Sequence, residues 1–315
     1  GPFAFNGIRF ILGSLSLLPL IFFRRKSLVN SAANAAPLRQ LLLSSLAAGI
    51  CLFIAVIFQQ FGLLFTTAGN AGFITGLYVV LTPIFGIFLG KKTGPATWLG
   101  SVFTLAGLYF LSAAGHPDSI NPGDIITVIS ALFWTAHVLL IDRLMQGAGP
   151  RSTQESESLP LDPIELSAGQ FAICGVLSLA GAFLAEPFVS AAAERIDPAL
   201  LKAGLFTWRP FPALIAALGT GAISFSMEAL IPILYGGLGS VGIAYTLQVI
   251  AQRDAPPAHA TIILCFEGCF AALGGVLLLS EKAGAWTLLG FFLMLTGMLI
   301  TQWEVIPKRA AGSGE

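Results

Sequence analysis

Apolar blocks of about 20 residues recur along this chain, and their length constrains the fold more than any other feature. A bilayer core about 30 Å thick is crossed by a helix of roughly 20 residues. With 56% hydrophobic and only 10% charged residues and a mean hydropathy of +0.85, an ordinary soluble domain is excluded. We predict an all-α polytopic membrane protein, a helix bundle with nine visible spans, at residues 3–23, 41–61, 68–90, 96–114, 125–141, 164–185, 229–251, 258–280 and 285–302.

A tenth apolar block, 211–227, is harder to assign, and the distribution of Lys and Arg decides it. Short cytoplasmic loops carry an excess of these residues. If 211–227 does not cross, one side of the membrane holds eleven of them and the other holds four; if it crosses, the split is nine against six. The non-spanning interpretation is favoured, and it predicts a cytoplasmic C-terminus and an N-terminus outside. Its cytoplasmic residues are Arg24, Arg25, Lys26, Arg39, Lys91, Lys92, Arg143, Arg151, Arg253, Lys308 and Arg309.

The stretch 71–111 is repeated within 258–301, with an offset of 190 positions and no gap. The offset superposes Lys92 on Lys282, Gly94 on Gly284, Thr97 on Thr287, Gly100 on Gly290 and Gly107 on Gly297. In a membrane chain, two homologous halves are typical of secondary transporters, whose substrate site lies where the repeats meet. The alternative is chance matching of Gly and Leu in apolar sequence.

Several short motifs accompany this repeat. They are Phe5-Asn6-Gly7-Ile8-Arg9-Phe10, Gln60-Phe61-Gly62-Leu63, Ala71-Gly72-Phe73, Pro83, Tyr245-Thr246-Leu247-Gln248, Gln252, Leu264-Cys265-Phe266-Glu267 and Leu278-Leu279-Ser280-Glu281. In their order and in the repeat, the chain resembles the EamA family of the drug/metabolite transporter superfamily over nearly its whole length.

The resemblance implies two inverted five-helix repeats, at 1–144 and 164–309, joined by a cytoplasmic linker at 145–163. The first of the family's ten helices has no counterpart in these 315 residues, and 203–228 stands as extra, non-spanning sequence. Lys91 departs from the pattern, because the first repeat of the family often carries a Glu there, matched by Glu281 in the second.

Two charged residues inside the apolar blocks are the leading site candidates, because an ionisable side chain within a membrane helix is costly. Glu267 lies near the middle of 258–280, where it either contacts a cationic substrate group or carries a coupling proton, unless it bonds structurally to a neighbouring helix. Arg9 lies two turns into its helix, where it either binds a substrate carboxylate or extends to the interface.

Further candidates for the substrate cavity are polar or aromatic. Tyr245, Gln248 and Gln252 share one helical stripe, which should face the bundle interior. His137 serves either as a proton relay or as a satisfied polar residue near the interface. Trp134 stacks on a flat substrate or packs in the core. Asn70 and Tyr78 form a weaker polar feature in the first half.

The remaining patterns exclude several functions. A formal net charge of zero gives no basic field for nucleic acid. No nucleophile elbow, phosphate loop or metal-ligand cluster appears, so we expect no cofactor, no metal and no catalytic residue. The resemblance instead implies a secondary active transporter working by alternating access. We expect export of small metabolites such as amino acids or related amphipathic compounds across a bacterial inner membrane, with proton coupling and a homodimer as open alternatives. The competing function is an integral-membrane enzyme acting on lipid-linked substrates.

Overall fold

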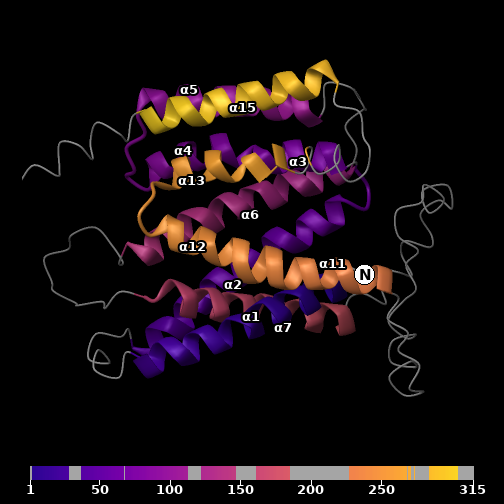
Figure 1. Cartoon of the computed structure of the whole chain (residues 1–315), viewed down its shortest axis with the longest axis vertical. Helices are drawn as coiled ribbons and strands as arrows, with labels where there is room; N and C mark the ends of the chain where they lie inside the picture. The colour runs from indigo at the N-terminus through magenta and orange to yellow at the C-terminus, as the bar shows by residue number, and fades with distance from the viewer. Residues whose placement is uncertain are drawn as a thin grey trace, which may run out of the picture. The chain divides into compact units, whose positions relative to one another are not determined.

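The computed structural model describes residues 2–27, 37–66, 68–112, 122–146, 161–184, 227–267, 269–270, 273 and 284–303. These residues are helical apart from short turns, and no strand occurs among them. Figure 1 shows the elements, which are α1 (Pro2–Ser27), α2 (Leu38–Gly62), α3 (Ala68–Gly76), α4 (Tyr78–Phe88), α5 (Pro95–Ser112), α6 (Pro122–Met145), α7 (Pro163–Leu184), α11 (Met227–Leu234), η2 (Tyr235–Tyr245), α12 (Thr246–Gln252), α13 (Pro257–Leu264) and α15 (Ala285–Trp303).

Each of the nine expected spans has a helical counterpart in this part of the chain. Six helices there are long and apolar enough to cross a membrane. Large apolar side chains also cover helix surfaces that face away from the protein, including Phe292, Leu288 and Val102. Such a surface is stable in lipid and not in water. The prediction of an all-α polytopic membrane protein is therefore confirmed.

Several elements differ in detail from the expected spans. The span expected at 68–90 is interrupted at Leu77, which separates α3 from α4. The span expected at 229–251 includes η2, an 11-residue π-helix. Helix α6 begins at Pro122, before the expected start at 125, and Asp124 in its first turn accepts a 2.5 Å hydrogen bond from the Thr66 hydroxyl. The block 211–226 lies outside the described residues.

The chain forms two compact units. The first contains Gly1–Ile57 and Leu144–Ile250, and the second contains Phe58–Arg143 and Ala251–Glu315. Each unit therefore draws on both halves of the sequence, and neither coincides with one of the expected repeats, whose boundaries at 1–144 and 164–309 stay a prediction.

In the second unit, α5 packs against α15 through glycines that contact each other reciprocally (Figure 1). A Cβ added at Gly100 would lie 2.6 Å from the carbonyl oxygen of Gly297, and one at Gly297 would lie 2.6 Å from that of Gly100. Gly107 and Gly290 show the same relation at 2.7 Å. Only glycine allows two backbones to approach this closely.

These contacts reproduce the sequence repeat. Under the offset of 190, the pair Gly100 and Gly297 becomes the pair Gly290 and Gly107, so the interface is mapped onto itself. Because residue numbers rise along α5 as they fall along α15, the two helices run antiparallel. Chance matching of glycines would not produce this reciprocity. The superposed helices are thus an inverted pair, as the sequence predicts.

In the first unit, α1 and α7 form a second pair of this kind, which sequence inspection missed. Gly7 packs on Leu179 and Gly175 packs on Ile11. An offset of 168 exchanges these two contacts, and it also superposes Phe3 on Phe171, Ala4 on Ala172 and Gly13 on Gly181. This repeat contains more substitutions than the one at offset 190, and its offset is different. A search of the sequence at offset 190 therefore does not reveal it.

The two offsets, 190 and 168, differ by 22 positions. The stretch from α7 to α15 is therefore 22 residues longer than the related stretch from α1 to α5. The extra stretch expected at 203–228 lies in this interval, although 203–226 falls outside the described residues.

Candidate functional site

Arg9 is a buried cation in the first unit. It stands two turns into α1, on a helix whose glycines press against α7 and η2. Only 9% of the residue is exposed, and its Nε has no hydrogen-bond partner. The guanidinium carbon lies 5.2 Å from the ring centroid of Phe5 and 5.0 Å from that of Phe10. Cation–π contact therefore stabilises the charge but leaves hydrogen-bonding capacity unused.

The Phe10 ring, which lies against this guanidinium, also contacts aromatic rings of two other elements. The Phe10 centroid is 6.0 Å from that of Phe171 on α7 and 6.1 Å from that of Tyr245 at the end of η2; Phe171 and Tyr245 are 6.4 Å apart. Phe10 and Phe171 are fully buried, whereas Tyr245 is half-buried. The structure thus brings two sequence candidates, Arg9 and Tyr245, into one cluster.

Asn6 lies one turn before Arg9 on α1 and is fully buried. Its Nδ2 donates to the carbonyl oxygen of Val56 at 3.4 Å, and its Oδ1 has no partner. We refer to Asn6, Arg9, Phe10, Phe171 and Tyr245 as the Arg9 cluster. Arg9 is the charged member of this cluster and keeps an unused donor at Nε, whereas the buried rings pack on one another.

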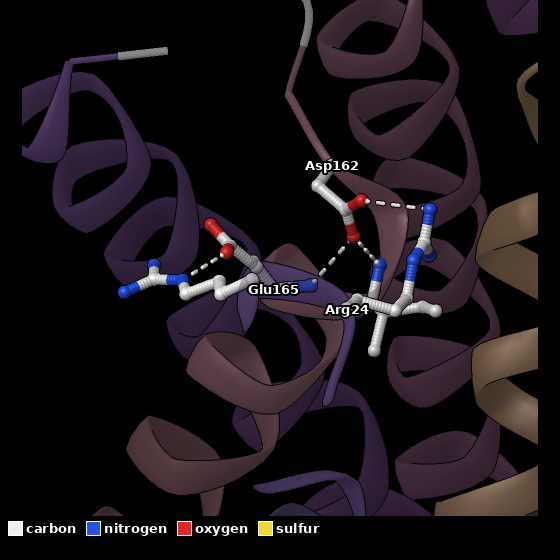
Figure 2. Close-up of polar contacts among 5 residues, drawn as sticks. Arg24, Asp162 and Glu165 are labelled. Atoms are coloured by element: carbon white, nitrogen blue, oxygen red, sulfur yellow. Dashed lines mark hydrogen bonds and ion pairs between the residues drawn. The ribbon is translucent and has the colours of Figure 1, made fainter. Parts of the chain in front are cut away.

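Ion pairs gather where α1 ends and α7 begins, and Figure 2 shows them. Arg25 donates to Glu165 at 2.7 Å, and Arg24 lies 3.5 Å from Asp162. Asp162 also accepts hydrogen bonds from the backbone N–H groups of Ile164 and Glu165, and so caps α7. These contacts place the two helix ends together; that both lie on the cytoplasmic side stays a prediction.

In the second unit, Lys91 forms a short ion pair with a buried carboxylate. Gly90, at φ +77°, ends α4 in the left-handed conformation, and the Lys91 N–H then donates to the carbonyl oxygen of Gly86. This turn directs the Lys91 ammonium to Asp142 near the end of α6, at 2.6 Å. Asp142 is fully buried, whereas Lys91 is 33% exposed. The departure from the family pattern at Lys91 thus has a local partner.

Most other candidates lie in the second unit. Trp134 and His137 are buried on α6 with their rings in edge contact at 6.0 Å. Gln252 is fully buried and donates to the carbonyl oxygen of Val138 at 3.2 Å. Tyr78 packs against the apolar cluster around Cys265. Asn70 and Gln248 are half-buried, and Glu267 is exposed.

Sequence reasoning missed Asp142, Asn6 and Phe171. Asp142 directly follows the block 125–141 and was excluded from the span, although α6 continues to Met145. Asn6 belongs to the motif at 5–10, but it is uncharged, and only the charged Arg9 of that motif was selected as a candidate. Phe171 lies within the apolar block 164–185, and no feature of the sequence distinguishes it from the other apolar residues there.

A metal centre finds no support in the described part of the chain. No group of three or more His, Cys, Asp or Glu residues there could hold an ion. Of the four cysteines, Cys174, Cys265 and Cys269 are buried and Cys51 is half-buried, and none of them forms a disulfide in the described part of the chain.

Comparison with known proteins gives three findings. The model of the EamA-like transporter family matches residues 1–113. Two proteins of Archaeoglobus fulgidus, each named "uncharacterized transporter", are similar to this chain. The first is 27% identical, over 96% of this chain and 78% of its own length. The second is 21% identical, over 95% of this chain and 87% of its own length. A solved crystal structure aligns with a TM-score of 0.67 at 15% identity, over 96% of this chain and 89% of that one. This last likeness shows the fold alone.

Proposed function

We propose that the protein is a secondary active transporter of small metabolites. The match of residues 1–113 to the EamA-like transporter family confirms the resemblance seen in the sequence and supports this proposal. The observation that carries the proposal is the reciprocal packing of α5 on α15 and of α1 on α7. Inverted repeats of this kind support alternating access, because exchanging the conformations of two related halves converts an inward-open state into an outward-open one.

The proposed cavity residues are those that the sequence indicates: Arg9, Asn70, Tyr78, Trp134, His137, Tyr245, Gln248, Gln252 and Glu267. Arg9 contacts the anionic end of the solute. Glu267 carries a coupling proton or contacts a cationic group. An exposed carboxylate within an apolar span is costly against lipid, by about 2.5 to 3.5 kcal/mol at the bilayer centre, which supports its facing water.

The finer parts of the proposal follow the family resemblance. We propose export of amino acids or related amphipathic compounds across the inner membrane of a bacterial cell. Proton coupling and a homodimeric assembly stay predictions.

Transport by the purified protein in sealed vesicles tests the function. A panel of radiolabelled amino acids and organic acids is loaded on one side, and efflux is followed with and without a pH gradient. We expect saturable, protein-dependent movement of at least one solute. Glu267→Gln should keep the fold and lose the pH dependence, whereas the control Asp254→Asn, which removes an exposed carboxylate outside the proposed cavity, should keep both. Vesicles that leak no solute of any class beyond empty controls would contradict the transporter assignment.

A further inference from the structure

Asp142 is a carboxylate that α6 buries completely, whereas its partner Lys91 is 33% exposed. The Lys91 ammonium lies 2.6 Å from an oxygen of Asp142. An ionised carboxylate in an apolar interior is stable only with a partner of this kind, and without one it is neutralised by a proton. The charge of Asp142 therefore depends on where the Lys91 ammonium lies.

Lys91 lies in a turn from which its side chain can also reach water. The preceding residue, Gly90, is exposed, and an added Cβ there would meet no atom within 4 Å. Lysine carries a strongly hydrated ammonium on a flexible stem, so this group can withdraw into water without movement of the backbone. The arrangement that competes with the ion pair is a hydrated Lys91 and a protonated Asp142.

The helix that leads into this turn, α4, is separated from α3 by the break at Leu77. Two backbone carbonyls around the break accept hydrogen bonds from side chains of other elements. The Gly76 carbonyl accepts from the Cys265 thiol at 3.9 Å, and the Val79 carbonyl accepts from the Ser101 hydroxyl at 3.3 Å. Such bonds make an interrupted helix compatible with burial in a membrane. Helix α4 is thus a separate segment that can change its angle at the break, and the ion pair holds its other end.

The other charged groups near this end of the second unit do not duplicate the pair. They are exposed to solvent, which weakens their effect on a buried carboxylate. Two histidines are less exposed, one buried and one half-buried. The titratable groups of the neighbouring elements are Lys92 after α4, His137 and Arg143 on α6, Arg253 and Asp254 after α12, and His259 on α13.

We infer that Asp142 is a proton-binding site, and that its ion pair with Lys91 holds the end of α4 against α6 only while Asp142 is ionised. When the pair opens, the Asp142 carboxylate takes one proton from water, Lys91 stays an ammonium ion, and no other covalent bond changes. The pair is therefore present at high pH and is lost as the pH falls. The inference goes beyond the proposed function, because this opening does not depend on the movement of a solute.

Distances between two spin labels measure this opening in the purified full chain in detergent. The labels are attached at Lys92→Cys, in the turn after α4, and at Ala136→Cys, at an exposed position of α6. A chain without added cysteines corrects for labelling of the native thiols. We expect one short, narrow distance distribution at about pH 8 and a distribution several ångströms longer at about pH 5. Infrared difference spectra should show that a protonated carboxyl is gained at the lower pH.

Variants separate the titration of Asp142 from a purely structural ion pair. Asp142→Asn should give the long distance at both pH values and lose the carboxyl band. Lys91→Gln removes the pair from the other side and should also give the long distance at both. Lys91→Arg should keep the pH-dependent opening, because guanidinium pairs with a carboxylate as well. The matched control Asp254→Asn removes an exposed carboxylate and should open as the wild type does.

The outcomes distinguish this site from the general function. The inference is overturned by a wild-type distance that is the same at both pH values, or by pH-dependent opening that persists in Asp142→Asn or Lys91→Gln. A carboxyl band that survives in Asp142→Asn overturns it as well. A protein that moves solutes in vesicles yet keeps one distance refutes the proton site and leaves the transporter. A protein that opens through Asp142 but moves no solute supports the site and contradicts transport.

Discussion

The helix pairs α5·α15 and α1·α7 pack in the same way, but only α1·α7 contains charged residues that break its symmetry. Both are antiparallel pairs of repeated helices that meet through glycines. In α5·α15 the glycines and their contacts are reciprocal, and the outward faces are apolar. In α1·α7 the symmetry is broken at Arg9, which faces no second arginine, and at the ends, where Arg24 and Arg25 meet Asp162 and Glu165. The comparison teaches that symmetric contacts hold the fold and that polar residues stand where the halves have diverged.

Substituting a glycine at the centre of α5·α15 should have the largest effect on stability. The Cβ of Gly107→Val would lie 2.7 Å from the Gly290 carbonyl oxygen, a backbone atom that cannot move without separating the helices. We expect a loss of about 1 to 3 kcal/mol or more. Gly290→Val should cost about the same by symmetry, and the double variant less than the sum, because the two sites share one contact.

Thermal unfolding in detergent measures these losses. Gly72→Val is the matched control, since a Cβ there meets no atom within 4 Å. Gly7→Val tests the other pair: a Cβ there would lie 2.6 Å from Leu179 Cδ2, which can move, and 3.1 Å from the Leu179 backbone nitrogen, so the loss should be smaller than at Gly107, where a backbone oxygen lies at 2.7 Å. Equal losses at Gly107 and Gly72 would show that the reciprocal contacts carry no stability.

The buried ion pair of the second unit should respond more strongly than the pairs at the ends of α1 and α7. Lys91→Gln leaves the Asp142 carboxylate buried without its ammonium partner, and we expect a loss of about 1 to 3 kcal/mol, below the usual value for a fully buried pair because Lys91 is partly exposed. Asp142→Asn leaves a lysine that can reach water, so its loss should be smaller.

Urea or thermal unfolding of both variants checks this order. Lys92→Gln is the control, because Lys92 is the exposed neighbour in the same turn. If Asp142→Asn proves more damaging than Lys91→Gln, burial of the carboxylate is not what makes this pair important.

The smallest effect is expected at the ends of α1 and α7. Arg25 is 64% exposed, so its pair with Glu165 should contribute only about 0.2 to 1 kcal/mol. A double-mutant cycle of Arg25→Gln and Glu165→Gln measures the coupling at low and at high salt. The coupling should decrease as salt screens the charges. A coupling near 3 kcal/mol that persists in 1 M salt would indicate that the membrane surface or another element excludes solvent from this pair.

Hydropathy was sufficient to predict the helices, because the bilayer requires about 20 apolar residues in each span whatever the packing. It was insufficient for the ends and interruptions. Leu77 is as apolar as its neighbours, so nothing in the pattern marks the break between α3 and α4. Among the site candidates, Arg9 and Tyr245 both lie next to Phe10. Gln252 was expected on one stripe with Tyr245, but it donates a hydrogen bond to Val138 of α6. Asp142 was missed because the apolar block ends at Ile141, although α6 continues to Met145.

By itself, the sequence determined the membrane class, the helical content and the internal repeat, because each depends on composition or on comparison of the chain with itself. The tertiary structure alone decided that Gly100 meets Gly297 rather than Gly290, that a second offset relates α1 to α7, and that Phe171 stands beside Phe10 and Arg9. The reason is physical. Burial in lipid acts on each helix separately, so local hydropathy predicts it. The packing partner of a helix depends on the shapes of two surfaces, and here these are set by glycines far apart in the chain.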